Sequence, residues 1–292
     1  MTERLSVIVA FYNMRREAAR TLFTLSPEYQ RDVRRSDYRV ICVDNGSRYP
    51  LDAHDVEAFG PNFEYHRIDN DSASPARAIN DQVANCPSEL VMVVIDGARM
   101  LTPGVLSLSL KAADAYPRPF AFTLGWHLGS ELQNIAMTRG YDQQAEDLLL
   151  ESIDWKQDGY QLFDISVLGG SYRGFLGGLP SESNCFVMRK SDYLSMGGYE
   201  TSFESPGGGL VNLDFFKRAM QNPDLDPVQL LGEGSFHQFH GGVATNVPRA
   251  QHPFERFAEE YEILRGEPFR AVTDRKIHFL GSLTEGARRF LI

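Results

Sequence analysis

The sequence is poor in cysteine, in positive charge and in long hydrophobic runs, and each shortage excludes a class of protein. Only three cysteines occur among 292 residues, at positions 42, 86 and 185. Their wide spacing fits neither a zinc motif nor a disulfide framework. Such cysteine usage is typical of a reducing compartment, so we expect a cytoplasmic protein. With 29 Lys and Arg against 39 Asp and Glu, the net charge is −10, which argues against a nucleic-acid partner.

Long apolar segments are also missing. No stretch approaches the roughly 20 consecutive apolar residues that a membrane span needs. The start of the chain lacks the basic and apolar regions of a signal peptide. We therefore expect no membrane span and no secretory leader.

What is present is an alternation of short apolar runs with helical patterns, within an ordinary composition of 42% hydrophobic and 23% charged residues. This order predicts an α/β fold with a mostly parallel central sheet and helices on both faces. The expected strands are 5–10, 38–43, 63–68, 91–95 and 120–124, and the expected helices are 15–25, 52–59, 75–84, 103–115 and 133–153.

Polar residues follow three of the expected strands, namely Asn13, Asp44 and Asp96. Because the carboxyl ends of parallel strands meet at one edge of the sheet, we expect these side chains to form a ligand site there. Asp96 follows the run Val91–Ile95 and precedes a glycine, so it stands where a metal ion or polar ligand would be met. The alternative is that this Asp-Gly pair only opens a turn.

Two histidines, His237 and His240, lie three residues apart in the glycine-flanked segment GEGSFHQFHGG. Imidazole binds manganese better than magnesium, so we expect one of them to join Asp96 as a metal ligand. The alternative is that one histidine caps a turn and the other packs in the core. Arg99 offers a fixed cation that could take over part of the metal's role.

Two further segments carry open interpretations. The glycine-rich stretch 159–178 contains Tyr172, Arg173 and Phe175 and is expected to be a functional lid or an acceptor groove, with plain disorder as the alternative. Residues 276–292 are expected to form a packed C-terminal helix, with a membrane-surface helix as the alternative.

Six stretches between residues 5 and 218 together resemble the family 2 glycosyltransferases. They are LSVIVAFYN (5–13), VICVDNGS (40–47), PARAIN (75–80), LVMVVIDGARMLTP (90–103), NCFVMRK with MGGYE (184–200) and LDFFKR (213–218). The resemblance implies a GT-A fold, with a nucleotide-binding half (1–125) followed by an acceptor half (126–248). Residues 249–292 lie outside the resemblance, and we expect a C-terminal helical extension there, with a possible role in homo-oligomer contacts.

The function implied by the resemblance is transfer of a sugar from a nucleotide-diphosphate donor, here a UDP-sugar, to an acceptor hydroxyl by inverting in-line displacement. A non-catalytic nucleotide-sugar-binding protein of the same fold is the alternative. An AdoMet-dependent methyltransferase is disfavoured, because that class has a glycine-rich turn after its first strand and this chain has Phe11-Tyr12-Asn13.

The resemblance also implies roles for the nucleotide-binding residues. Tyr12 and Asn13 would line the nucleoside pocket. Asp44 would accept a hydrogen bond from the base, with turn capping as its alternative role. Arg77 would reach the pyrophosphate or the base, with a solvated helix face as the alternative.

The catalytic and metal roles complete the expected site. Asp214 would be the base that deprotonates the acceptor, and Glu204 is the weaker candidate. Asp96 would hold Mn²⁺ or Mg²⁺, and the family places a second acid two residues later, where this chain has Ala98. A further ligand must then come from elsewhere, which is why we favour His237 or His240.

Overall fold

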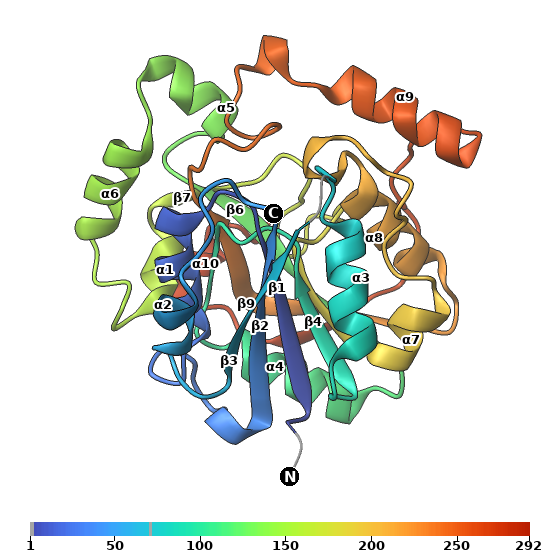
Figure 1. The fold of residues 1–292 in the computed structure, drawn as a ribbon, viewed down its shortest axis with the longest axis horizontal. Helices are drawn as coiled ribbons and strands as arrows, with labels where there is room; N and C mark the ends of the chain where they lie inside the picture. Colours follow the sequence, from blue (N-terminus) through green and yellow to red (C-terminus); the bar gives the residue numbers. More distant parts are fainter. Residues whose placement is uncertain (1–2, 70–71) are drawn as a thin grey trace.

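The computed structural model describes residues 3–69 and 72–292, and these form one ten-stranded sheet flanked by helices (Figure 1). The strands are β1 (Leu5–Phe11), β2 (Tyr38–Asn45), β3 (Phe63–Ile68), β4 (Leu90–Val94), β5 (Arg99–Leu101), β6 (Pro119–Leu128), β7 (Ser166–Leu168), β8 (Cys185–Arg189), β9 (Asp226–His237) and β10 (His278–Gly281). The α-helices are α1 (Arg15–Leu25), α2 (Ala53–Glu57), α3 (Ala76–Asn85), α4 (Val105–Ala115), α5 (Gln133–Ala136), α6 (Gln143–Glu151), α7 (Lys190–Ser195), α8 (Val211–Gln221), α9 (Phe254–Arg265) and α10 (Glu285–Arg288). The 3₁₀ turns are η1 (Arg35–Asp37), η2 (Met137–Arg139), η3 (Gly159–Phe163), η4 (Pro206–Gly208) and η5 (Arg249–Gln251).

The sheet is mostly parallel, as the sequence predicts. Its order is β10-β9-β6-β8-β4-β1-β2-β3, with β5 added against β9 and β7 against β6. On one side of β8, the strands β6, β9 and β10 run parallel to one another, and on the other side so do β4, β1, β2 and β3. The strand β8 itself is antiparallel to both β4 and β6. The carboxyl ends of β1, β2, β4, β6 and β9 therefore lie at one edge, which is uppermost in Figure 1.

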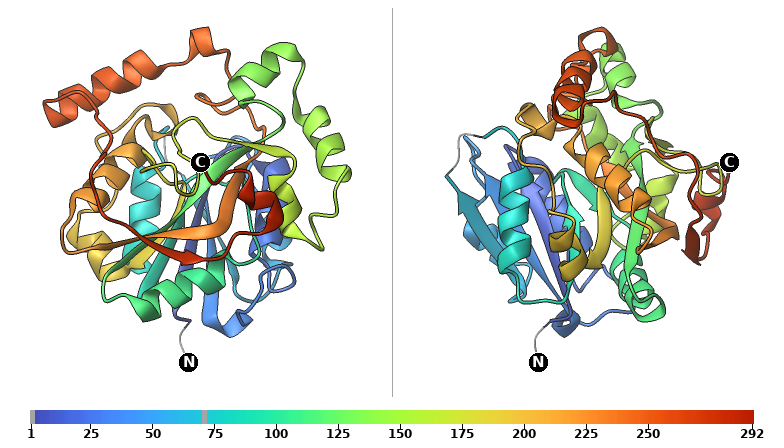
Figure 2. Two further views of the ribbon diagram at one scale, coloured as in Figure 1. Left: turned by 180° about the vertical axis from the view of Figure 1, so that it is seen from behind. Right: turned by 90° about the vertical axis from the view of Figure 1, so that its right-hand side faces the viewer.

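Helices cover both faces of the sheet because the side chains of its central strands alternate between two cores. Val7 of β1 packs in the cluster that contains Leu22 of α1 and Leu106 of α4. Ile8, the next residue of β1, packs in the opposite cluster with residues of α3 and α8. In the right-hand view of Figure 2, α3 and α8 lie in front of the strands, on the same face of the sheet.

The glycine-rich stretch is part of a third core cluster rather than a lid. Tyr172 and Phe175 are 6% and 1% exposed, and Phe175 packs with Trp126 and Phe236. The aromatic side chains of this stretch are buried against β6 and β9, so they do not form an open lid. A role of the stretch in an acceptor groove stays a prediction.

The segments at either side of the carboxyl edge differ from the expected helices. The stretch 133–153 is broken into α5, η2 and α6, since Gly140 adopts a left-handed φ of 94°. Residues 249–292 contain α9, but they are not wholly helical as expected. Residues 278–281 pair in parallel with β9 as the edge strand β10, and only the single turn α10 follows. In the part of the chain that the structure describes, no helix has the length and hydropathy needed to cross a membrane.

Candidate metal centre

The structure brings Asp96, His237 and His240 together at the carboxyl edge of the sheet. Asp96 Oδ2 lies 3.1 Å from His237 Nε2, and Asp96 Oδ1 lies 3.9 Å from His240 Nε2. The two Nε2 atoms are 3.2 Å apart. One ligand atom from each residue therefore lies within 4.8 Å of the others, an arrangement that could hold a metal ion. The pairing of a strand-end carboxylate with both late histidines agrees with the sequence expectation.

A sharp turn after β4 positions Asp96. Its Oδ1 accepts a hydrogen bond from Ala98 N at 3.0 Å, so the Asp-Gly pair does open a turn while Oδ2 faces His237. Gly97 N donates to Ala10 O at 2.7 Å, and a Cβ at Gly97 would lie 2.8 Å from that oxygen. Glycine is required here by the close approach of the end of β1.

His237 is held by a side chain from α5. Gln133 Nε2 donates to His237 O at 2.9 Å, which fixes the amide so that Gln133 Oε1 accepts from His237 Nδ1 at 2.7 Å. The lone pair of the ring is then on Nε2, which faces Asp96. Metal-binding histidines commonly donate their other ring N–H in this way. Burial lowers the pKa of His237 to about 4, so the imidazole is neutral and available as a ligand at neutral pH.

His240 is positioned by its own loop. Asn246 Oδ1 accepts the backbone N–H groups of His240, Gly241 and Gly242 at 3.0, 2.9 and 3.0 Å. On the other side, Phe239 N donates to the buried Glu146 at 2.7 Å. The structure thus brings both histidines next to one carboxylate, while His237 is also buried as its alternative interpretation expects.

The charges around Asp96 favour its ionised form. Burial raises the pKa of Asp96, but the combined opposite effect of His237, His240 and Arg99 is larger. The pKa of Asp96 therefore lies well below its usual range. The Arg99 side chain is 7% exposed and its Nε lies 3.5 Å from Asp96 Oδ2. Arg99 is opposite His237 in the β5–β9 pair, so this fixed positive charge belongs to the same site.

His127 is a site neighbour that the sequence did not single out. Its ring centroid lies 5.4 Å from that of His237, and the two residues are paired across β6 and β9. Burial lowers its pKa, as do His237 and Arg99. Among residues 3–69 and 72–292, His127 Nδ1 finds no hydrogen-bond partner. Neither His127 nor Gln133 stands in a recognisable motif. The pairing of β6 with β9 reveals His127, and the hydrogen bonds between α5 and β9 reveal Gln133.

The residues expected to bind the nucleoside lie at the ends of β1 and β2. Asn13 Oδ1 accepts Arg48 N at 2.9 Å, and Tyr12 is 52% exposed. Asp44 is fully buried, and its oxygens accept from Ser47 N at 2.8 Å and Leu51 N at 3.1 Å. This is the turn-capping interaction named as the alternative for Asp44.

Arg77 lies in the first turn of α3, where its side chain is exposed. This position matches the solvated helix face that was its alternative role. A contact between Arg77 and a pyrophosphate stays a prediction.

Asp214 lies in a different environment from the one expected of a catalytic base. It is 1% exposed in the first turn of α8. Arg265 of α9 donates from Nε to Oδ1 at 2.7 Å and from an Nη atom to Oδ2 at 2.8 Å. Arg218 Nε also donates to Oδ2, at 2.8 Å. Both carboxylate oxygens are therefore occupied by guanidinium groups, an arrangement typical of a structural ion pair. Glu204, the weaker candidate, is exposed beside α9.

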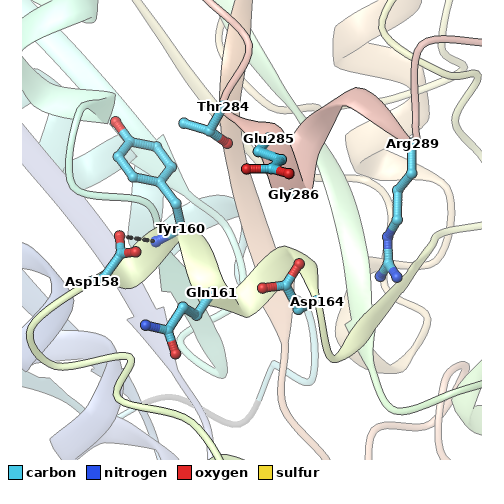
Figure 3. A pocket seen from close by; sticks show the side chains of 8 residues that line it. All are labelled: Asp158, Tyr160, Gln161, Asp164, Thr284, Glu285, Gly286 and Arg289. Atoms are coloured by element: carbon cyan, nitrogen blue, oxygen red, sulfur yellow. Dashed lines mark hydrogen bonds between the residues drawn. The ribbon is translucent and has the colours of Figure 1, made fainter.

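Figure 3 shows a cavity of about 530 Å³ elsewhere, between η3 and α10. Its lining residues are Asp158, Tyr160, Gln161, Asp164, Thr284, Glu285, Gly286 and Arg289. None of the residues expected in the site lines this cavity, so it is separate from the candidate metal centre.

No family model matches the chain, and no curated protein matches it either. Several solved structures do resemble it. An amino-terminal fragment of S. aureus TarS in complex with UDP matches with a TM-score of 0.53 and 12% identity, covering 82% of this chain and 60% of the fragment. A longer TarS structure gives 0.56 and 14%, covering 91% of this chain and 40% of that one. The mannosyltransferase PcManGT from Pyrobaculum calidifontis, in complex with GDP-Man and Mn²⁺, gives 0.50 and 14%, covering 93% and 66%.

These identities are low, so the likeness shows the fold, which is the GT-A type of α/β fold expected from the sequence. The chain spans less than two thirds of each of these two TarS structures. The fold and the Asp-His-His cluster together define a GT-A-like domain with a candidate metal centre.

Proposed function

We propose that this protein transfers a sugar from a nucleotide-diphosphate donor, a UDP-sugar, to an acceptor hydroxyl by inverting in-line displacement. The observation that carries the proposal is the convergence of Asp96, His237 and His240 at the carboxyl edge of a GT-A sheet. Ligands of open α/β sheets bind at this edge. The similar structures hold UDP, UDP-GlcNAc, or GDP-Man with Mn²⁺, and this supports the same donor class.

The three clustered side chains would hold a divalent cation. Their donor set fits one: an ionised carboxylate, a neutral imidazole fixed by Gln133, and a second imidazole nitrogen 3.2 Å from the first. The mixed nitrogen and oxygen ligands favour Mn²⁺ over Mg²⁺. When bound, such a cation neutralises the negative charge of a leaving diphosphate.

The chain's own residues supply the rest of the donor site. Arg99 adds a permanent positive charge beside Asp96, which suits a diphosphate because a guanidinium cannot be titrated away. Exposed Tyr12 offers a ring for a nucleobase, and Asn13 orders the loop after β2 next to it. Asp44 stabilises this loop by accepting hydrogen bonds from Ser47 N and Leu51 N. It could contact the nucleobase only if these hydrogen bonds were broken. Arg77 would reach a phosphate from the first turn of α3.

A nucleotide-sugar-binding protein without transferase activity is the second candidate, because the ion pairs of Asp214 remove the base that the sequence suggests. We place either function in the cytoplasm, since all three cysteines are free and buried, as is usual in a reducing compartment.

Calorimetric titration with UDP, with and without Mn²⁺, tests the donor site. We expect Mn²⁺-dependent binding that Asp96→Ala weakens at least about tenfold, the size of loss seen when even an outer partner of a metal ligand is removed. Asp55→Ala, which removes an exposed carboxylate of α2, serves as the control and should bind as the wild type does.

Other results would change the proposal in defined ways. Binding that does not depend on Mn²⁺ would assign the neutralising role to Arg99 and Arg77. Failure to bind UDP under both conditions would remove the donor assignment and leave the fold unchanged. Stabilisation by AdoMet but not by UDP would indicate a methyltransferase instead.

A further inference from the structure

We infer that Glu182, a residue that no motif singles out, is the general base of the proposed transfer reaction. The inference rests on the proposed function, because a sugar transferase needs a group that accepts the proton of the acceptor hydroxyl. The carboxylate of Asp214 is enclosed by Arg218 and Arg265, so the role requires another acid.

Strand register places Glu182 at the correct edge of the sheet. The antiparallel strand β8 starts beside the end of β4, with Cys185 opposite Val94. Ile95 N donates to Asn184 O at 3.3 Å, so the residue before Asp96 is paired with the residue two positions after Glu182. Glu182 therefore enters the sheet at the end where Asp96 leaves it.

A buried amide network orients the carboxylate. Asn212 Nδ2 donates to Glu182 Oε2 at 2.8 Å, while Tyr199 OH donates to Asn212 Oδ1 at 3.2 Å. Asn212 is 6% exposed and lies at the start of α8, two residues before Asp214. One oxygen of Glu182 is thus held in place by a neutral donor, which orients the carboxylate without occupying both oxygens.

The other oxygen is available to a ligand. Within the described ranges 3–69 and 72–292, Glu182 forms no ion pair, and Oε1 receives no hydrogen bond. The side chain is only partly buried. Asp214 differs on each of these points, because guanidinium groups of two helices hold both of its oxygens.

A hydroxyl group, that of Tyr172, links Glu182 to the surroundings of the cation site. Tyr172 OH accepts a hydrogen bond from Asn184 Nδ2 at 2.6 Å, and Asn184 Oδ1 accepts one at 3.5 Å from Asn212 Nδ2, the group that also holds Glu182. Burial raises the pKa of Tyr172, the charge of Glu182 raises it further, and the charge of Arg99 lowers it, so both charges act on this hydroxyl. Arg99 in turn lies beside Asp96. A donor diphosphate beside Arg99 would therefore lie at the same edge of the sheet as Glu182.

In the reaction, the acceptor oxygen forms a bond to the anomeric carbon of the donor, and its proton passes to Glu182 Oε1. The bond between the anomeric carbon and the diphosphate oxygen breaks, and its electron pair leaves with the diphosphate. Arg99 offsets the charge that develops on this leaving group.

The test compares the wild type with Glu182→Gln, which keeps the shape of the side chain and its bond to Asn212 but cannot accept a proton. UDP binding in the presence of Mn²⁺ is measured by calorimetry. Turnover is measured as release of UDP or GDP from UDP-glucose, UDP-GlcNAc and GDP-mannose, with water as the acceptor. We expect the variant to bind UDP as the wild type does and to turn over at least about 100-fold more slowly, with little change in the KM for the donor.

Two further variants separate a proton-accepting role from a structural one. Glu57→Gln removes an exposed acid of α2, and it should keep the wild-type rate. Glu182→Ala should regain part of its turnover when formate is added, since a small carboxylate can replace the missing base but cannot repair a fold.

The outcomes separate this inference from the proposed function. A wild-type protein that turns over donors, with Glu182→Gln equally fast or Glu57→Gln equally slow, would overturn the role of Glu182 alone. Loss of UDP binding in both Glu182 variants, without formate rescue, would make the residue structural and would also overturn it. A wild type that binds but never cleaves a donor would overturn the transferase proposal, and the role of Glu182 with it.

Discussion

The lone pair that His237 directs at Asp96 depends on Gln133, which lies 104 residues away in the sequence. Removing this amide frees the ring to rotate and to exchange its tautomer. We predict that Gln133→Leu weakens Mn²⁺ binding by about 10- to 100-fold, the range observed for outer partners of metal ligands. The measurement is a Mn²⁺ titration by calorimetry.

The neighbouring Asn134 provides the matched control for this prediction. It is an amide on the same short helix, and its Oδ1 finds no partner within the residues that the structure describes. Asn134→Leu should leave Mn²⁺ affinity within about twofold. Equal losses in the two variants would mean that α5 itself, and not the hydrogen bond to His237, supports the site.

Glu233 gives the fold a pH dependence of its own. It is 4% exposed and accepts hydrogen bonds from Gly104 N at 3.1 Å, from Tyr160 OH at 2.8 Å and from Thr102. Burial raises its pKa to about 7, although these hydrogen bonds oppose the shift. Between the unfolded pKa near 4.5 and this value, the folded protein holds more protons than the unfolded chain. The free energy of unfolding therefore falls as pH rises through that window and levels off above about pH 7.

Comparison of the wild type with Glu233→Gln isolates this effect, since glutamine cannot titrate. A shift of this size corresponds to about 3 kcal/mol. Urea unfolding at pH 5 and pH 8 should show the wild type losing up to that amount relative to the variant. Parallel pH profiles for the two proteins would mean that Glu233 is already ionised in the fold at pH 5.

At the scale of secondary structure, the sequence predicts elements whose signals are local. The predicted bounds of α1 and β3 are confirmed. The amphipathic pattern of α1 and the alternating pattern of β3 both end at turn-forming residues, which makes these bounds readable from the sequence. The strands β5, β7 and β10 lie outside the predicted strands, since three or four residues carry no period and pair only because a partner strand is at hand. The long strand β9 is not predicted either, because Gly232 and Gly234 interrupt its apolar pattern. The family resemblance includes the residues of β8, but no local pattern in the sequence indicates that this strand runs antiparallel to its neighbours.

The same distinction explains the outcome at the site. Asp96, His237 and His240 could be found because their residue types and positions after apolar runs suggest ligands, and the structure brings them together. The environment of Asp214 could not be foreseen, because Arg265 lies 51 residues later, outside the family resemblance. Residue type alone does not reveal whether a carboxylate meets solvent or a guanidinium.

The ion pair of Asp214 with Arg265 joins α8 to α9, and we predict that it stabilises this contact. Arg265→Leu removes two charge-assisted hydrogen bonds from a buried carboxylate that keeps Arg218. We expect a loss of about 2 kcal/mol in the free energy of unfolding, typical of hydrogen bonds to charged groups. Arg256→Leu, on the exposed side of α9, should change it by less than about 0.5 kcal/mol. A stable Arg265→Leu variant that no longer turns over donors would instead point to a catalytic role for Asp214.

At the scale of the whole molecule, residues 284–292, here called the tail, return to the sheet and complete the third core cluster. Phe290 packs against Trp126 and Phe163, with ring centroids 5.4 and 6.0 Å apart. Phe290 O accepts the N–H of Phe175, and so fixes the stretch that presents Tyr172 to the network of Glu182. The position of the tail in this cluster should therefore influence the position of Tyr172, next to the proposed base Glu182.

Phe290→Ala should accordingly weaken both stability and turnover. A partly buried aromatic ring packed on two others is worth about 2 kcal/mol, somewhat less than a fully buried one. Both tryptophans of the chain belong to this cluster, so urea unfolding followed by tryptophan fluorescence reports directly on it. The adjacent Leu291, 37% exposed, gives the control Leu291→Ala, which should unfold as the wild type does.

If the tail positions Tyr172 and Glu182, Phe290→Ala will also slow donor cleavage under conditions where the variant is fully folded, while UDP and Mn²⁺ bind unchanged. Full activity in a destabilised Phe290→Ala variant would show that the tail serves packing alone.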